Sequence, residues 1–203
     1  VMRCAVDIST IDVDAASHHG VLVTRSIPTF ATSVSELAIG FMIDGARGIS
    51  RAVAAYRNAQ DPNLAMGQQI SGKTLGICGF GVIGRHLASL GQALGMKVVI
   101  TDPAPGTLPD GMTDVPFNTL LETSDFVVCL APSTPQTAGL FGASEFAMMK
   151  PTAMFINLAR GELVDEAALE QALDTNTIAC AAMDVGSAPD QRPASRLAGR
   201  DDV

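Results

Sequence analysis

The sequence predicts an α/β fold with a doubly wound parallel sheet, and two observations predict it. From Lys73 onward, short apolar runs alternate with segments that carry apolar residues at helical spacing. In addition, the residues GFGVIG at 79–84 join the first apolar run to the first helical segment. Ligands bind such sheets beyond the carboxyl ends of the strands, so the segments that follow each strand form the candidate site.

The elements expected in this region are strands near 74–79, 97–101, 126–130, 153–157 and 178–184, and helices near 82–94, 118–123, 143–149 and 165–174. Thr101 to Pro116 is rich in Pro and Gly and is expected to be a loop. Asp165 is expected to cap the helix that follows it. Short strands and helices in strict alternation favour a parallel sheet over an antiparallel one.

The first 57 residues follow a different pattern. We expect a strand at 3–8, a short helix at 12–18 closed by Gly20, and a strand at 21–25. After Pro28, a long helix is expected from Ser33 to about Tyr56, because Ser33 and Glu36 have the spacing of a capping box.

The glycine motif indicates a dinucleotide site. Gly79 permits the tight turn out of the strand, Gly81 lets the backbone approach a pyrophosphate, and Gly84 lets the helix pack on the strand. The next strand ends in Asp102, whose carboxylate suits the two ribose hydroxyls of an adenosine and would repel a 2′-phosphate. This unit predicts a Rossmann-type domain that binds NAD in preference to NADP.

Arg160 is the candidate substrate-binding residue. It follows a buried strand, and its planar guanidinium suits bidentate capture of a carboxylate. The alternative is an ion pair with Glu162, Asp165 or the C-terminal tail. Asp184, at the end of the fifth strand, would either contact a nicotinamide amide or cap a loop.

Composition limits the function classes. The net charge of −8, without a basic cluster, argues against nucleic acid or an anionic membrane as partner. No apolar run approaches the roughly 20 residues of a membrane span, and no signal peptide is indicated. The four cysteines form no CxxC pair, so no metal site is expected; we interpret them as buried thiols of a cytoplasmic protein.

Several motifs together resemble the D-isomer-specific 2-hydroxyacid dehydrogenases. The glycine segment LGICGFGVIG at 75–84 resembles their cofactor signature, and NLARGELVDEAAL at 157–169 resembles their second signature. APSTPQT at 131–137 and AMDV at 182–185 also match, and the similarity extends from about residue 8 to the end of the sequence.

The resemblance implies hydride transfer between NAD(H) and a D-2-hydroxy acid or 2-oxo acid. It implies that Arg160 holds the substrate carboxylate and polarises its carbonyl. The implied cofactor contacts are Gly79, Gly81, Val82, Ile83 and Gly84 at the pyrophosphate, Asp102 at the adenosine ribose, and Pro132, Thr137, Ala159 and Asp184 at the nicotinamide half.

The resemblance also implies a domain organisation. Residues 1–27 would be part of a flavodoxin-like substrate-binding domain. Residues 28–203 would form the NAD-binding domain, with an interdomain helix at 28–57 and a tail at 186–203. The helix from Ser33 would contribute to a homodimer interface.

The sequence departs from the family pattern at the proton-transfer residues. The family's Pro-His segment would follow a strand beginning near Val203, and His18, His19 and His86 do not replace its histidine. Pro189 stands where the family has a Glu, with Asp190 next to it. We therefore interpret the sequence as an incomplete copy of such an enzyme, either part of a longer protein or a degraded relative, expected to bind NAD(H) without normal turnover.

A second departure lies near the start, where Ala5-Val6-Asp7 lacks the glycines of the family's substrate-side loop. Two alternative functions remain open. One is a non-catalytic NAD-sensing protein of the same ancestry, which Pro189 favours and Arg160 disfavours. The other is an unrelated Rossmann protein that binds another adenosine ligand, such as S-adenosylmethionine.

Overall fold

The computed structural model spans residues 1–203 and describes all of them except 5–7, 9–10, 28, 63–65, 189–190 and 194. Its centre is a six-stranded, entirely parallel sheet in the order β5-β4-β3-β6-β7-β8. The strands are β3 Thr74–Cys78, β4 Lys97–Thr101, β5 Met112–Asp114, β6 Phe126–Cys129, β7 Met154–Asn157 and β8 Cys180–Met183. The strand order reverses between β3 and β6, so the predicted doubly wound Rossmann fold is confirmed.

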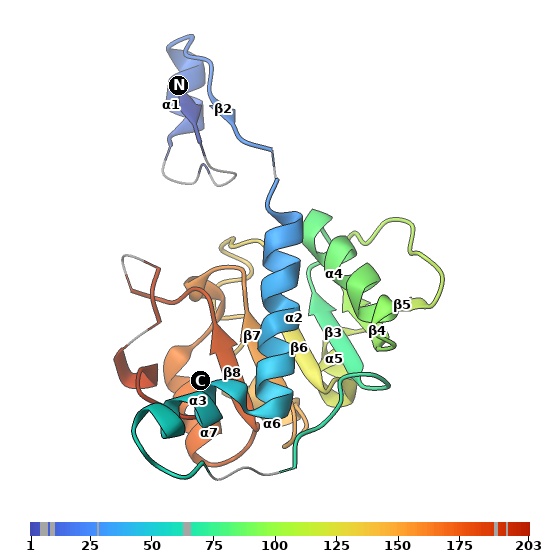
Figure 1. The fold of residues 1–203 in the computed structure, drawn as a ribbon. Coiled ribbons are helices and arrows are strands. Elements are labelled where there is room, and N and C mark those ends of the chain that lie inside the picture. Colours follow the sequence, from blue (N-terminus) through green and yellow to red (C-terminus); the bar gives the residue numbers. More distant parts are fainter. Residues whose placement is uncertain (5–7, 9–10, 28, 63–65, 189–190, 194) are drawn as a thin grey trace.

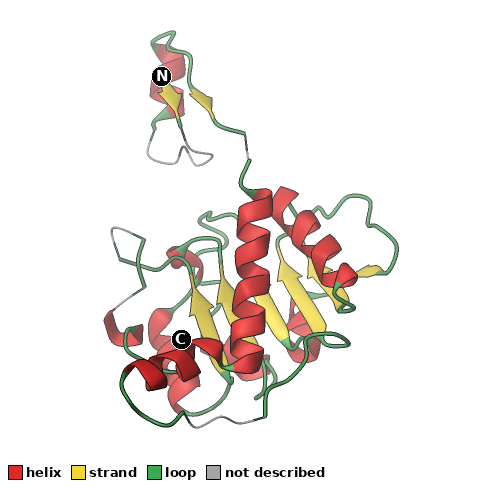
Figure 2. Cartoon of the chain, viewed as in Figure 1, coloured by secondary structure: helices red, strands yellow, loops and turns green. Residues whose placement is uncertain are grey.

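Helices cover both faces of this sheet (Figures 1 and 2). They are α2 Ala31–Arg47, α3 Ile49–Arg57, α4 Val82–Ala93, α5 Phe117–Thr123, α6 Ala143–Met148 and α7 Glu166–Asp174, with 3-10 turns at Gly161–Leu163 and Ser195–Leu197. Alternate strand residues feed two separate apolar layers. Leu75 and Ile77 pack with Met42 of α2 and Leu87 of α4, whereas Phe155 packs with the layer of α5, α6 and α7.

The described residues among the first 25 form a small unit that lies away from the six-stranded sheet (Figure 1). It contains β1 Met2–Arg3 paired in parallel with β2 Thr24–Arg25, and α1 Val13–His18 between them. The Asp12 carboxylate caps α1 by accepting a hydrogen bond from Ala15 N at 2.8 Å. Part of the expected first strand lies outside the described residues, and β2 is shorter than expected.

The predicted start of the long helix is wrong. The first helical hydrogen bond runs from Val34 N to Phe30 O, so α2 begins at Ala31, and its N-cap, Phe30, makes no side-chain cap bond. Ser33 is therefore already inside the first turn, where it cannot form the expected capping box with Glu36. Ala31 and Thr32 extend the helix in the direction of β2.

The predicted single helix is also divided in two at Gly48. Gly48 adopts a left-handed conformation with φ of 63°, which favours glycine. The carboxylate of Asp44, from the last turn of α2, accepts hydrogen bonds from Ser50 N at 2.7 Å and from Ser50 Oγ at 2.5 Å. Asp44 thereby supplies the N-terminal cap that α3 needs after the break.

Two further expectations are corrected. The stretch predicted as a loop between Thr101 and Pro116 contains the edge strand β5, which pairs with β4. Of the cysteines, Cys78 and Cys129 are buried and Cys180 is half-buried, but Cys4 is exposed on the small N-terminal unit. The apolar run around Cys4 does not place it in a core, because that unit has no buried residue in α1 and lies outside the main domain.

Candidate functional site

The loops at the carboxyl ends of four adjacent strands are joined to one another by backbone hydrogen bonds. These are Leu130 N to Cys78 O at 2.7 Å, Leu158 N to Cys129 O at 3.2 Å, and Asp184 N to Asn157 O at 3.1 Å. On the other side, Gly79 N donates to Thr101 O at 2.9 Å. The predicted site residues therefore lie along one edge of the sheet, from Asp102 past the glycine turn and Pro132 to Arg160 and Asp184.

The three glycines of the turn have different surroundings. Gly79 has φ of 101°, and a Cβ placed on it would lie 2.7 Å from Ala131 N. A Cβ on Gly84 would lie 2.3 Å from Gly79 O, so the start of α4 packs directly on the turn. A Cβ on Gly81 would meet no atom within 4 Å. The outer two glycines are required by packing, whereas the middle one borders open space.

The amino end of α4 faces that open space. The first hydrogen bond of the helix runs from Arg85 N to Gly81 O at 3.0 Å, so the amides of Val82, Ile83 and Gly84 have no acceptor within the helix. Free amides and the positive end of the helix dipole bind anions. The open space beside Gly81 and these amides fit the pyrophosphate of a dinucleotide.

Asp102 is anchored beside the turn. Its Oδ2 accepts a hydrogen bond from Phe80 N at 2.6 Å, and its Oδ1 accepts one from Ala104 N at 2.8 Å. A carboxylate offers about four acceptor positions, so two remain for ribose hydroxyls. Burial, and secondarily the Asp102 charge, raise the pKa of the Cys78 thiol to about 12. That thiol stays neutral at the base of the site.

The loop after β6 is shaped by Thr137. Its hydroxyl donates to Pro132 O at 2.6 Å and accepts from Thr134 N at 2.9 Å. Pro132 is exposed at the rim. The hydroxyl of Thr137 is therefore already bonded within the loop when no cofactor is bound. The loop lies against the glycine turn, because Gly79 is in close contact with Ala131.

Arg160 lies half-buried at the start of the 3-10 turn, in an extended backbone conformation. Its Nη1 donates to Ala159 O at 2.7 Å. None of the ion pairs found in the described part of the chain involves Arg160. Glu162 instead accepts from Gln191 Nε2 at 3.3 Å, and Asp165 caps α7 as predicted, accepting from Ala167 N at 3.0 Å. The guanidinium retains donors for a ligand.

Two buried polar side chains that the sequence motifs did not single out bind the loops that follow β7 and β8. Asn157 is fully buried; its Nδ2 donates to Arg160 O at 2.9 Å and its Oδ1 accepts from Ala159 N at 3.0 Å. Glu166, 6% exposed, accepts from Ser187 N at 2.7 Å. A polar residue ending the apolar strand segment Met154–Asn157 was the available signal for Asn157.

The loops of Arg160 and Asp184 also touch through glycines. A Cβ on Gly161 would lie 2.0 Å from the carbonyl carbon of Gly186, and one on Gly186 would lie 2.2 Å from Pro193. The backbones are thus in direct contact. Pro189 and Asp190 lie outside the described residues, as do Ala5, Val6 and Asp7, so the predictions about the two departures from the family pattern remain predictions.

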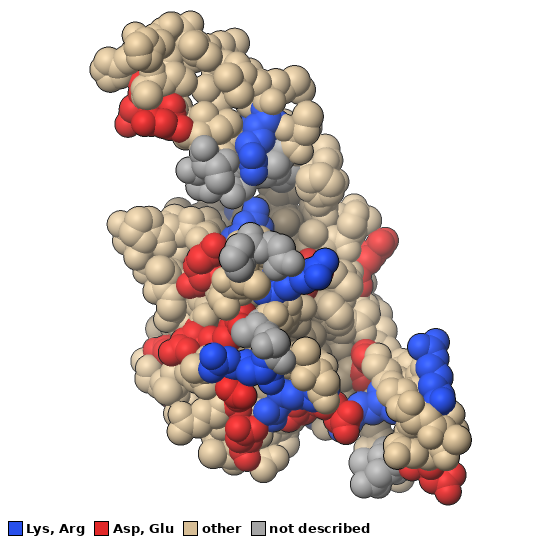
Figure 3. Space-filling view, turned by 90° about the vertical axis from the view of Figure 1, so that its left-hand side faces the viewer, with Lys and Arg blue, Asp and Glu red and all other residues tan. Residues whose placement is uncertain are grey.

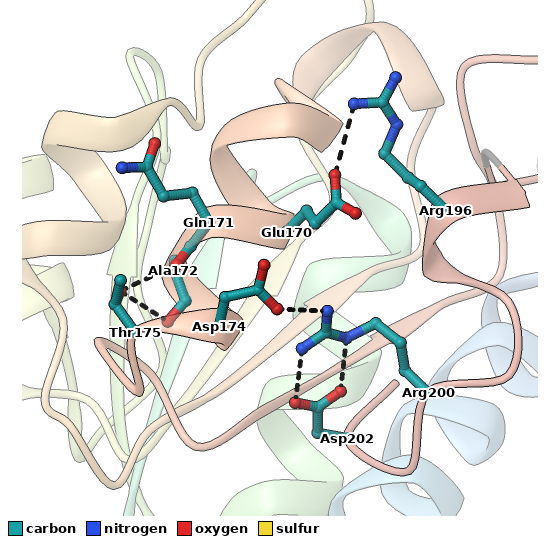
Figure 4. A network of polar contacts seen from close by, with 8 residues as sticks. All are labelled: Glu170, Gln171, Ala172, Asp174, Thr175, Arg196, Arg200 and Asp202. Atoms are coloured by element: carbon teal, nitrogen blue, oxygen red, sulfur yellow. Dashed lines mark hydrogen bonds and ion pairs between the residues drawn. The ribbon is translucent and has the colours of Figure 1, made fainter.

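The C-terminal segment is fastened to α7 by ion pairs (Figure 4). Arg200 pairs with Asp174 and Asp202, each at 2.7 Å, and Arg196 pairs with Glu170 at 3.4 Å. Ala181 N of β8 donates to Asp202 O at 2.8 Å. Acidic and basic side chains are accordingly interspersed on this face (Figure 3). A cavity of about 640 Å³ between α2, α3, β8 and this segment contains none of the predicted site residues.

The three histidines lie elsewhere. His18 and His19 are exposed at the end of α1, and His86 is half-buried on α4. In the part of the chain that the structure describes, no group of three or more His, Cys, Asp or Glu side chains could hold a metal ion. Nor does that part include a helix long and apolar enough to cross a membrane.

A parallel sheet of this strand order, with a glycine turn at the switch point and an acid at the end of the next strand, defines a dinucleotide-binding α/β domain. Residues 39–203 match the family model of the D-isomer specific 2-hydroxyacid dehydrogenase NAD binding domain. The chain belongs to this family, and NAD is the cofactor of the matched domain. The hypothesis of an unrelated S-adenosylmethionine-type protein is therefore wrong.

Known proteins agree with this assignment. The chain is 36% identical over 190 residues to D-3-phosphoglycerate dehydrogenase of Methanocaldococcus jannaschii, covering 90% of this chain and 36% of that protein. It is 34% identical over 186 residues to hydroxypyruvate reductase of Thermotoga maritima, covering 91% and 61%. The chain thus spans about a third of the first of these relatives.

Solved structures of other enzymes have a similar fold. A glyoxylate reductase from Paecilomyes thermophila has a TM-score of 0.87 and 30% identity, covering 98% of this chain and 62% of that one. D-lactate dehydrogenase with NAD+ from Lactobacillus jensenii has a TM-score of 0.80 and 30% identity, covering 98% and 64%.

Proposed function

We propose that this chain binds NAD(H) and forms the cofactor-binding part of an oxidoreductase that transfers a hydride between NAD(H) and a D-2-hydroxy acid or 2-oxo acid. The observation that carries the proposal is the placement of Asp102, the open space at Gly81, and Arg160 in order along one sheet edge. That order corresponds to the order of groups in a bound dinucleotide, with adenosine at one end and the reacting carbon at the other.

Each residue would have a defined task. Asp102 would accept hydrogen bonds from the adenosine ribose, and the amides of Val82, Ile83 and Gly84 would bind the pyrophosphate. The bound nicotinamide supplies or accepts the hydride. Pro132, Thr137, Ala159 and Asp184 would border that ring. Gly79 shapes the turn that carries these contacts.

Arg160 would bind the substrate. Its carboxylate-binding fork would fix a 2-oxo acid and draw charge toward the carbonyl oxygen, which gains negative charge during hydride transfer. Asn157 binds the backbone of Ala159 and Arg160, which fixes the point from which the guanidinium extends. Electrostatic stabilisation of this kind requires donors fixed in advance.

The first test is binding. The chain has no Trp, so NADH fluorescence can be followed without energy transfer from indole. We expect NADH to bind, NADPH to bind more weakly because of Asp102, and adenosine alone to bind far more weakly than NAD. Failure to bind NADH at millimolar concentration, or equal affinity for adenosine and NAD, would contradict the proposal.

The second test separates hydride transfer from the alternative, a non-catalytic NAD-sensing protein, which Pro189 at the family's Glu position favours. The protein that carries this chain is assayed for NADH oxidation with glyoxylate and hydroxypyruvate. Turnover of either substrate supports the dehydrogenase. NADH binding without turnover of any 2-oxo acid supports the sensing function.

Further parts of the proposal follow from the family. Residues 1–27 would belong to a substrate-binding domain and 28–203 to the NAD-binding domain, with 28–57 between them. We propose a homodimer in a cytoplasmic setting. The apolar residues Ile49 and Val53 on the exposed side of α3, 49% and 42% exposed, support an interface there.

A further inference from the structure

The loop between β4 and β5, residues 102–111, begins with Asp102 and has few backbone hydrogen bonds of its own. Its closing backbone hydrogen bond, from Met112 N to Pro109 O, is long at 3.3 Å. Pro103, Pro105 and Pro109 have no amide hydrogen to donate. Side chains therefore help to fix this loop between its two strands, and one of them is Leu108, which packs against the core.

Two side chains of α4 hold the loop by its carbonyl groups. Arg85 donates from Nη1 to Thr107 O at 3.1 Å and from Nη2 to Pro105 O. Gln92 donates from Nε2 to Asp110 O at 2.9 Å. Arg85 and Gln92 are seven residues apart, so they lie on the same face of the helix two turns from each other.

Arg85 also contacts the glycine turn. Its guanidinium carbon lies 4.5 Å from the centre of the Phe80 ring, within cation–π range. The Phe80 amide is the group that donates to Asp102 Oδ2. One exposed side chain thus joins the two segments between which the Asp102 carboxylate is held.

We propose that Arg85 is a positioning residue for the adenosine end of the cofactor, fixing loop 102–111 against the glycine turn before the cofactor arrives. The inference rests on the proposed binding of NAD(H). A binding-site loop that is already ordered lowers the entropy cost of binding. Arg85 therefore raises affinity only for ligands that contain the adenosine half.

The test compares Arg85→Gln and Arg85→Lys with the unmodified protein. Dissociation constants are measured for NADH, ADP-ribose and reduced nicotinamide mononucleotide, which lacks adenosine. Arg85→Gln is expected to raise the constants for NADH and ADP-ribose by the same factor, roughly 5- to 30-fold. The constant for the mononucleotide stays unchanged. Arg85→Lys is intermediate, because Lys keeps the charge over Phe80 but lacks the planar fork.

Lys97→Gln is the matched control, because it removes one positive charge from the same region. Lys97 is the exposed first residue of β4, at the opposite end of that strand from Asp102, and its replacement should change none of the three constants. Hydrogen exchange gives a readout that needs no ligand. The amides of Ala104 and Met112, which donate to Asp102 Oδ1 and Pro109 O, should exchange faster in Arg85→Gln than in the control variant, while the two variants keep the same melting temperature.

The outcomes are distinguishable. Unchanged NADH affinity in Arg85→Gln, or an equal loss for the mononucleotide, overturns the positioning role and leaves the proposed function intact. Unchanged hydrogen exchange in the loop contradicts the inference that Arg85 fixes the loop. An unmodified protein that binds neither NADH nor ADP-ribose overturns the proposed function, and the positioning role with it.

Discussion

Replacing Gly81 and Gly84 by Ala, one at a time, tests whether each glycine is needed for ligand binding or for packing within the protein. A Cβ on Gly81 meets nothing within 4 Å, and its backbone, with φ of −72° and ψ of −161°, is open to any residue. A Cβ on Gly84 would lie 2.3 Å from Gly79 O, well inside van der Waals contact. The same small change should therefore affect ligand binding at Gly81 and stability at Gly84.

The magnitudes follow from these contacts. Gly81→Ala should leave the free energy of unfolding within about 0.5 kcal/mol of the original value. If the added methyl group costs one charge-assisted hydrogen bond to a phosphate, worth about 1.5–3 kcal/mol, the NADH dissociation constant rises roughly 10- to 150-fold. Gly84→Ala must push α4 off the turn, at about 1–3 kcal/mol, which lowers the melting temperature by roughly 2–12 °C.

The assay is a thermal melt and an NADH titration on each variant. Gly81→Ala should melt like the unmodified protein and bind NADH weakly. Gly84→Ala should melt early. The reasoning is refuted if Gly81→Ala binds NADH normally, because the open space would then not be the pyrophosphate site, or if Gly81→Ala is as unstable as Gly84→Ala.

Three other predictions concern charged groups. Burial acts to raise the pKa of Asp125, but hydrogen bonds from Thr74 N and Lys150 Nζ outweigh it and hold the pKa below its ordinary value. The contribution of the Asp125 carboxylate to the free energy of unfolding is therefore complete above the unfolded pKa of about 3.9 and is lost as the pH falls further. Asp125→Asn should destabilise the protein by about 1 kcal/mol at pH 7 and by much less at pH 2.5. Equal losses in urea melts at both pH values would contradict this. Asp102→Asn should narrow the ratio of NADPH to NADH dissociation constants, and an unchanged ratio would remove Asp102 from cofactor choice. Arg160→Lys, in the protein that carries this chain, should lower kcat/KM for a 2-oxo acid by roughly 100-fold or more, whereas a normal value would exclude bidentate binding.

The sequence predicted the elements of the main domain well where a strand is a continuous apolar run or a helix has a clear apolar period. The strands at 97–101 and 126–130 and the helix at 82–94 were found within a residue, because buried parallel strands are continuous apolar runs and helices show their own period. The strand Met112–Asp114 was missed because it is three residues long, lies among prolines and glycines, and is recognisable only by its pairing with β4.

The remaining misses depend on contacts distant in sequence. The apolar pattern continues through Gly48, and the break between the two helices is visible only in the structure, from the left-handed conformation of Gly48 and the bond from Ser50 N to Asp44. The site motifs predicted which loops gather at the sheet edge, but not how they are held. Glu166 was not expected to bind the amide of Ser187, which is 21 residues away, because neither the buried carboxylate nor that close approach has a local signal.

The exposed thiol of Cys4 provides a natural attachment point for a spectroscopic label. Burial raises the pKa of Cys78 to about 12 and that of Cys180 to about 11, and it also suppresses ionisation of Cys129. A maleimide dye at neutral pH should therefore react with Cys4 alone. Because Cys4 lies on the small β1–α1–β2 unit, a dye there would report, without any mutation, whether that unit moves when NADH binds at the carboxyl ends of the strands.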